Sequence, residues 1–171
     1  MFKRTVLFVA ASIVALPAQA QDAKIDPAHI MTVMKDAGYP AEFYNDDGDY
    51  RQILSKSGDY QFLVEMYDCV DGAACETLEF YSNFPMEEKP TKEKLDSYSG
   101  TRDGTSIALD RRGDVVVRQE LDVDGGLADD QFIARLKSWE ALIDEFVAYL
   151  TAAPDTDAPA AAATEAAADA G

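Results

Sequence analysis

The two cysteines of the chain, Cys69 and Cys75, have the spacing that bears most directly on chemistry. The five residues between them include Asp71-Gly72, a turn signal between two segments that we predict to be strands. The spacing differs from the Cys-x-x-Cys of redox enzymes, and two cysteines with one distant histidine do not supply four zinc ligands. We therefore expect a disulfide across the hairpin tip, which stabilises the fold by about 2 kcal/mol in an oxidising compartment.

Catalytic groups do not form a recognisable set in this sequence. His29 is the only histidine, and it lies beside the apolar stripe of a short predicted helix, so we interpret it as structural. With that histidine alone, no nucleophile–histidine–acid arrangement can be assembled, and the sequence has no glycine-rich phosphate loop. The chain has 32 acidic residues, so chance pairs of carboxylates give no specific support to a glycosidase. We expect no enzymatic activity and no catalytic, cofactor-binding or metal-binding residues.

One acidic segment imitates the start of a calcium loop. Its acids at positions one, three and five and its glycine at position six are Glu120, Asp122, Asp124 and Gly125. Position twelve is Gln131 instead of a bidentate glutamate, and the segment leaves a predicted strand instead of a helix. We interpret it as a turn with solvated acids, and a small-ligand or calcium-binding envelope stress protein remains the alternative function.

The rest of the chain is organised around the stretch from Thr105 to Leu150. Alternating apolar residues predict an antiparallel hairpin of two strands, with Ile107 and Leu109 on the buried face of the first strand. A helix of about 22 residues follows from Asp129, and at about 33 Å it is too long for one hairpin to cover. It needs a sheet, a second helix or a partner subunit. Its apolar stripe consists of Phe132, Leu136, Trp139, Ile143, Phe146 and Leu150.

The preceding part of the chain predicts two further helices and four further strands. Asp26-Pro27 is typical of a helix start, and Gly38 ends that helix. Leu95 and Tyr98 are expected to point inward from a short middle helix. The four strands are Ala41 to Tyr44, Tyr50 to Leu54, Tyr60 to Tyr67 and Glu76 to Phe84, and the middle helix is Thr91 to Ser99. The fold class is therefore α+β, an antiparallel sheet of five to six strands in the order α-β-β-β-β-α-β-β-α.

The first 20 residues have the three regions of a secretory signal peptide. Lys3-Arg4 is followed by the apolar run from Thr5 to Leu16, a proline, and Ala18-Gln19-Ala20. Cleavage after Ala20 is expected. The run is too short to span a membrane comfortably, and no cysteine at the cleavage point could take a lipid. We expect a periplasmic or secreted protein without a membrane span.

Charge and composition indicate which partners are excluded and where the domain ends. Removing Lys3 and Arg4 with the leader takes the formal net charge from −17 to −19, and such a field repels nucleic acid. Residues 153–171 are alanine with scattered acids and prolines, which predicts a disordered tail. Residues 21–152 then form a single α+β domain.

The stretch from about Asp26 to Leu150 resembles the YbjN family of bacterial proteins, often labelled sensory transduction regulators. The resemblance rests on Phe62 to Cys69, Cys75 with Leu78-Glu79-Phe80, Leu109 to Val116, Leu121 to Gly126, and Phe132 to Trp139. Where the family often has Asn-x-Trp-Asn, this chain has Asp96-Ser97-Tyr98-Ser99. Such proteins are similar in fold to type III secretion chaperones, commonly paired as dimers. The resemblance implies a non-catalytic protein that binds another protein or peptide.

The leading hypothesis is an exported adaptor, chaperone-like or regulatory module with an unknown polypeptide partner. We expect binding through a sheet face or through the stripe of the last helix, which could also form a homodimer interface around Trp139. Tyr44, Tyr50 and Tyr67 are expected to be exposed and to supply amphipathic contact area.

Overall fold

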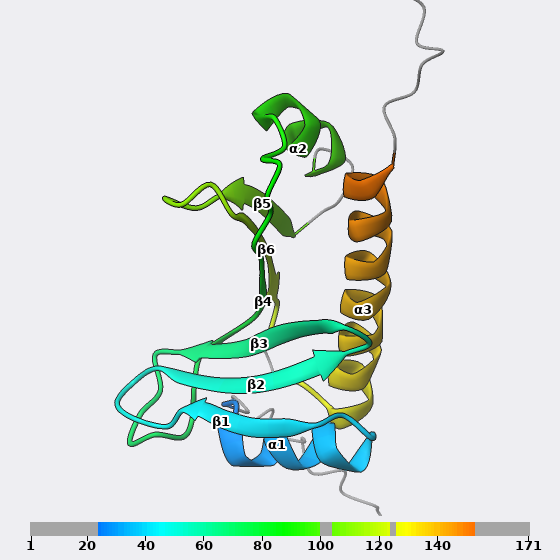
Figure 1. Ribbon diagram of the computed structural model, residues 1–171. Helices are drawn as coiled ribbons and strands as arrows, with labels where there is room; N and C mark the ends of the chain where they lie inside the picture. Colours follow the sequence, from blue (N-terminus) through cyan, green and yellow to red (C-terminus); the bar gives the residue numbers. More distant parts are fainter. Residues whose placement is uncertain (1–23, 100–103, 124–125, 153–171) are drawn as a thin grey trace, which may run out of the picture.

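A computed structural model of the protein describes residues 24–99, 104–123 and 126–152 (Figure 1). The predicted leader and tail lie outside these residues, as do Asp124 and Gly125 of the calcium-like segment. Its elements are α1 (Pro27–Asp36), β1 (Ala41–Asn45), β2 (Arg51–Ser57), β3 (Tyr60–Tyr67), β4 (Thr77–Phe84), α2 (Lys92–Ser99), β5 (Thr105–Leu109), β6 (Val115–Leu121) and α3 (Asp129–Thr151). This sequence of elements confirms the predicted α+β order.

The six strands form one antiparallel sheet in the order β1-β2-β3-β4-β6-β5. The first four are neighbours in the chain as well as in the sheet. After α2, however, the chain places β5 at the far edge and returns through β6, which pairs with β4. This return sets β6 in the interior of the sheet, where residues distant in sequence become cross-strand partners.

The helix ends follow from local chemistry. The Asp26 carboxylate accepts a hydrogen bond from the Ala28 backbone N–H at 2.9 Å, and Pro27 occupies the first helical position of α1. Gly38, just after α1, has φ of +92°, which a residue with a Cβ adopts only with strain. Asp129 and Asp130 lie in the first turn of α3, at the positive end of its dipole.

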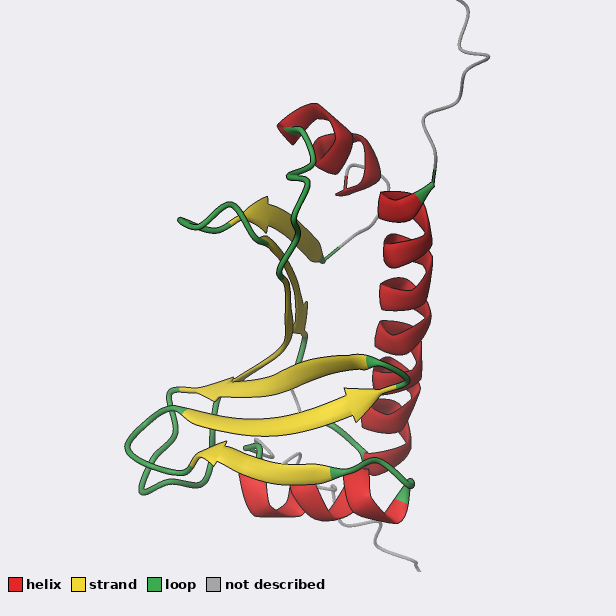
Figure 2. Ribbon diagram, in the orientation of Figure 1, coloured by secondary structure: helices red, strands yellow, loops and turns green. Residues whose placement is uncertain are grey.

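One face of the sheet is covered by α3, which runs along it (Figures 1 and 2). Trp139 is 0% exposed, and its ring lies 5.5 Å from that of Phe80 on β4. Phe80 also packs against Phe132, with 6.1 Å between ring centroids. The proposed homodimer interface around Trp139 is therefore wrong, because the sheet of the same chain already covers this stripe. Burying each such side chain contributes about 1.5–3 kcal/mol.

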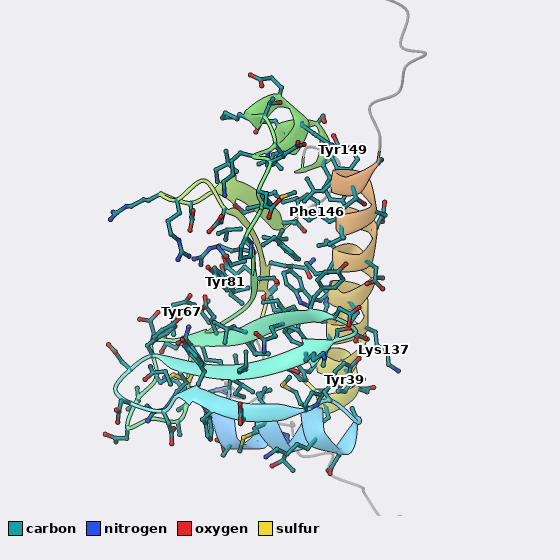
Figure 3. The ribbon with its side chains drawn as sticks, in the orientation of Figure 1. Tyr39, Tyr67, Tyr81, Lys137, Phe146 and Tyr149 are labelled. Atoms are coloured by element: carbon teal, nitrogen blue, oxygen red, sulfur yellow. A yellow bond between two sulfur atoms is a disulfide. The ribbon has the colours of Figure 1, made fainter. Side chains whose placement is uncertain are left out.

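The middle helix α2 packs against the C-terminal half of α3. Tyr98 is buried as predicted, with 5.0 Å between its ring centroid and that of Phe146, and Leu95 is buried too. Figure 3 shows Phe146 and Tyr149 on the side of α3 nearest α2. Leu109 differs from its predicted position: it is 40% exposed whereas Ile107 is buried. Leu109 ends strand β5, which lies at the edge of the described sheet and pairs with β6 on one side, so its side chain stays partly open.

Candidate functional site

The face of the sheet turned away from α3 holds the candidate site, and we call it the open face. Strand register aligns one row of its residues across all six strands, namely Glu42, Leu54, Leu63, Tyr81, Arg118 and Ser106. A shallow hollow of about 490 Å³ lies here, and its lining includes Tyr44, Tyr50, Tyr67, Tyr81, Glu65 and Arg118. Tyr67 and Tyr81 lie on the opposite side of the sheet from α3 (Figure 3).

The buried carboxylate of Glu65 organises the open face. The side chain of Glu65 on β3 is only 5% exposed, although it lies on the face that none of the described helices covers. One of its oxygens accepts hydrogen bonds from the Tyr50 hydroxyl at 2.6 Å and from the Gln52 amide at 2.7 Å. The other oxygen accepts from the Tyr67 hydroxyl at 2.6 Å. A buried charge without such donors would be costly, so these three contacts are what allow it to stay there.

Two of the tyrosines that were expected to be exposed are half-buried. Tyr50 and Tyr67 stack with 4.8 Å between ring centroids, and both hydroxyls donate to Glu65. Their bonds to one carboxylate hold both rings down on the sheet, which corrects the prediction. Tyr44 is 67% exposed, as expected. Burial first, and then the bond to Glu65, raises the pKa of Tyr67 to about 12, and the same causes raise that of Tyr50.

Arg118 on β6 connects the tyrosines with the acidic side chains. Its guanidinium donates to Glu79 at 2.5 Å and lies 3.7 Å from the nearer oxygen of Glu65. It also lies over the Tyr81 ring, 4.8 Å from the centroid, which is a cation–π contact. Burial raises the pKa of Glu79, and the charges of Glu65 and Glu120 add to this, while Arg118 opposes it.

The disulfide between Cys69 and Cys75 is present, as predicted, in the loop from β3 to β4. The Cys69 backbone N–H donates to the Asp49 carbonyl at 2.9 Å, next to Tyr50. Cys75 exchanges two backbone hydrogen bonds with Ile25, at 2.8 and 3.0 Å. The bridged loop therefore holds two other segments close to the end of β3: the segment before α1, through Ile25, and the residues just before β2, through Asp49.

Gly72 shows how tightly this loop packs on the sheet. Its φ is +74°, and a Cβ built there would lie 2.0 Å from the Arg51 Nη2 atom. Arg51 in turn donates from Nε to the Gly72 carbonyl at 3.2 Å and pairs with Asp46 at 3.4 Å. Glycine is therefore favoured by its backbone conformation, and a Cβ at this position would displace the Arg51 guanidinium.

The remaining sequence candidates lie away from the open face or fall outside the described residues. His29 Nε2 is 2.7 Å from a carboxylate oxygen of Asp129, so that it connects α1 with the start of α3. Within residues 24–99, 104–123 and 126–152, no group of three or more His, Cys, Asp or Glu side chains could hold a metal ion. In the same part of the chain, no helix combines the length and hydropathy that a membrane span requires.

Glu65, Gln52, Tyr81 and Arg118 are site residues that were not predicted from the sequence. The signal available was the alternation of β3, which places Glu65 on the face opposite Val64 and Met66. That pattern predicts a solvated glutamate. Nothing local shows that the donors to it come from the start of β2 and the end of β3.

Fold and site together define a small α+β domain in which the described helices cover one face of the antiparallel sheet and leave the other face open. The model of the YbjN family, described as "Putative bacterial sensory transduction regulator", matches residues 26–152. The protein therefore belongs to the YbjN family, and this membership supports a regulatory or adaptor role in general terms. No curated protein and no solved structure matches the chain.

Proposed function

We propose that this protein is an exported, non-catalytic adaptor or regulatory protein that binds a polypeptide on its open face. The observation that carries the proposal is the gathering of Tyr44, Tyr50, Tyr67, Tyr81 and Arg118 around one hollow. Tyrosine and arginine are enriched among the residues that dominate binding energy at protein interfaces. Rings already held in place by Glu65 lose little side-chain entropy on binding, which favours affinity.

The polar contacts of the open face favour recognition over catalysis. Both oxygens of Glu65 accept from tyrosine hydroxyls, and Arg118 donates to Glu79. A general base needs a free acceptor within reach of a substrate proton, and a nucleophile needs an activating base. Glu65, Glu79 and Arg118 are therefore already engaged with partners on this face, and they present a fixed surface.

Export is supported by two independent features. The bridged cysteines fit an oxidising compartment, and the first 20 residues have the pattern of a cleaved leader. An intact mass spectrum of the protein from the exported fraction tests both features at once. It should show a chain beginning at Gln21 that weighs two hydrogen atoms less than the reduced form. A full-length reduced chain would contradict export.

Binding is tested by selecting peptides from a phage-displayed random library on the oxidised mature chain. Affinities of the enriched peptides are then measured by fluorescence anisotropy for the native chain, Tyr81→Ala and Lys137→Ala. Lys137 is the matched control because it is exposed on α3, away from the open face (Figure 3). We expect Tyr81→Ala to weaken binding at least about tenfold and Lys137→Ala to leave it unchanged. No enrichment, or equal loss in both variants, would contradict the proposal.

A further inference from the structure

We infer that the polypeptide bound by the open face is an extended cationic segment, with a lysine or arginine over Glu79 and Glu120 and an apolar side chain two positions away over Leu63, beside Tyr81. This inference rests on the proposed function and adds the chemistry of the partner. Its basis is the arrangement of two adjacent rows of side chains that the strand register produces.

The first row is acidic. Glu65, Glu79 and Glu120 are register partners on β3, β4 and β6, so their side chains lie on the same face of three neighbouring strands. Adjacent strands lie about 4.8 Å apart, which allows one ammonium or guanidinium group to contact two of these carboxylates. Arg118 is the cation paired with this row, where it contacts Glu79 and Glu65. Three carboxylates beside one guanidinium leave an excess of negative charge.

Glu120 is the member of this row that is open to a partner. It is exposed, and no cationic side chain among the described residues pairs with it. Its neighbour Glu79 has a raised pKa, caused first by burial and then by the like charges of Glu65 and Glu120. A bound cation would relieve that repulsion. The formal net charge, which is −17 for the full sequence and −19 without Lys3 and Arg4 of the predicted leader, also attracts cationic segments from a distance.

The middle of the second row is apolar and aromatic, and Glu42 and Arg118 flank it in register. Leu54, Leu63 and Tyr81 are partners on β2, β3 and β4, two residues along the strands from the acidic row. In an extended peptide, side chains two positions apart point to the same side and are about 6.8 Å apart, the same step as between the two rows. A peptide aligned with β4 therefore presents one basic and one apolar side chain to the sheet at matching positions. Tyr44 provides further exposed aromatic area nearby.

Other occupants match this pair of rows less well. A second copy seated on the same face by a two-fold axis would bring like-charged rows together, which is costly. The chain's own residues 153–171 carry acids and no lysine or arginine, so the acidic row repels them as well. Nucleic acid is excluded by the same repulsion. A cationic segment is the occupant whose charge complements the face.

The experiment uses labelled, amidated peptides and the oxidised mature chain. The first peptide repeats Thr-Lys-Thr-Leu, which places lysine and leucine two positions apart on one side. Its composition-matched control repeats Lys-Thr-Thr-Leu, which places them on opposite sides, and a third peptide repeats Thr-Glu-Thr-Leu. We expect the first peptide to bind at least about tenfold more tightly than either control, with an affinity that falls as salt rises. Equal binding of the lysine and glutamate peptides would overturn the inference.

Variants locate the contact. Glu79→Gln with Glu120→Gln should weaken the first peptide at least about tenfold, whereas Asp36→Asn with Asp144→Asn, a matched charge change on α1 and α3, should leave it unchanged. Glu120→Gln alone should leave the fold intact, because Glu120 is exposed. This single variant should still weaken binding of the first peptide measurably. Equal loss in both double variants would overturn the inference. Sedimentation of the chain with and without peptide gives a further test. A dimer that dissociates when peptide is added would also overturn the inference, because a second copy of the chain would then occupy the open face.

Different results would contradict the polypeptide-binding function and the cationic nature of the partner. If phage selection yields peptides that depend on Tyr81 but are neutral or acidic, the polypeptide-binding function holds and the cationic partner is wrong. If no peptide binds with dependence on Tyr81, the proposed function itself is wrong.

Discussion

Phe80 and Tyr81 are consecutive residues of β4 that serve opposite faces of the sheet. The Phe80 ring is buried between Phe132 and Trp139, where only its apolar area matters. The Tyr81 ring lies half-buried beneath the Arg118 guanidinium on the open face. The covered face uses phenylalanine and tryptophan to exclude water, whereas the open face uses tyrosines fixed by polar partners. Aromatic residues in one strand therefore stabilise the fold on one side and shape a binding surface on the other.

The largest expected effect separates these two roles directly. Phe80→Ala should lower the free energy of unfolding by about 3–5 kcal/mol, because it removes transfer energy and leaves a cavity beside Trp139. Tyr81→Ala, one residue away, should cost less than about 1 kcal/mol while it abolishes most of the peptide binding. Urea unfolding and fluorescence anisotropy measure the two quantities. Equal destabilisation by both substitutions would erase the distinction between the faces.

The disulfide fastens the edge of the open face and has the next largest effect. Replacing both cysteines by serine should lower the free energy of unfolding by about 2 kcal/mol, since the reduced unfolded chain gains entropy. Gly72→Ala keeps the disulfide but forces Arg51 to move, and it should also destabilise the chain. Thermal unfolding of the oxidised proteins measures both. A double serine variant as stable as the native chain would contradict the role of the loop.

Alkaline titration tests the Glu65 cluster. The folded chain raises the pKa of Tyr67 from 10.0 to about 12, so this residue contributes stability below pH 10 that is lost as the pH rises to about 12. Glu65→Gln removes the negative acceptor and should shift this loss to lower pH, and it should weaken peptide binding. Glu140→Gln is the matched control, because Glu140 accepts a hydrogen bond from the Tyr39 hydroxyl. Burial and this contact raise the pKa of Tyr39 to about 12 as well. Glu140→Gln should lower the pKa of this one tyrosine in a near-ultraviolet absorbance titration and leave peptide binding unchanged.

The smallest effect concerns Glu79. Its pKa is raised above 4.5 by burial and by the facing Glu65 and Glu120, against the opposing charge of Arg118; Tyr67 lies nearby as a neutral phenol. The folded chain therefore holds this proton more strongly than the unfolded chain does. Glu79 should accordingly contribute less stability as the pH rises through its folded pKa. Glu79→Gln should flatten the pH dependence of the melting temperature in the acidic range where the raised pKa of Glu79 lies. An unchanged slope would contradict the shift.

The sequence predicted the secondary structure well because short-range patterns set it. The alternation within β3 and the four-three spacing within α3 depend only on neighbouring residues, as do the Asp26 cap and the cysteine loop. Leu109 was misplaced because alternation does not reveal that a strand end lies at a sheet edge. The half-buried state of Tyr50 and Tyr67 was missed because their partner, Glu65, was assumed to be solvated.

Local sequence thus determined which residues form strands and helices, where the chain turns, and which residues alternate on each strand. Only the tertiary structure decided that α3 is covered by its own sheet, which removes Trp139 from any interface. It also decided that β6 returns beside β4, which brings Arg118 to Tyr81 and Glu120 to Glu79. The physical reason is that periodicity is a property of adjacent residues, whereas the burial of a carboxylate such as Glu65 depends on donors that strand pairing brings from elsewhere in the chain.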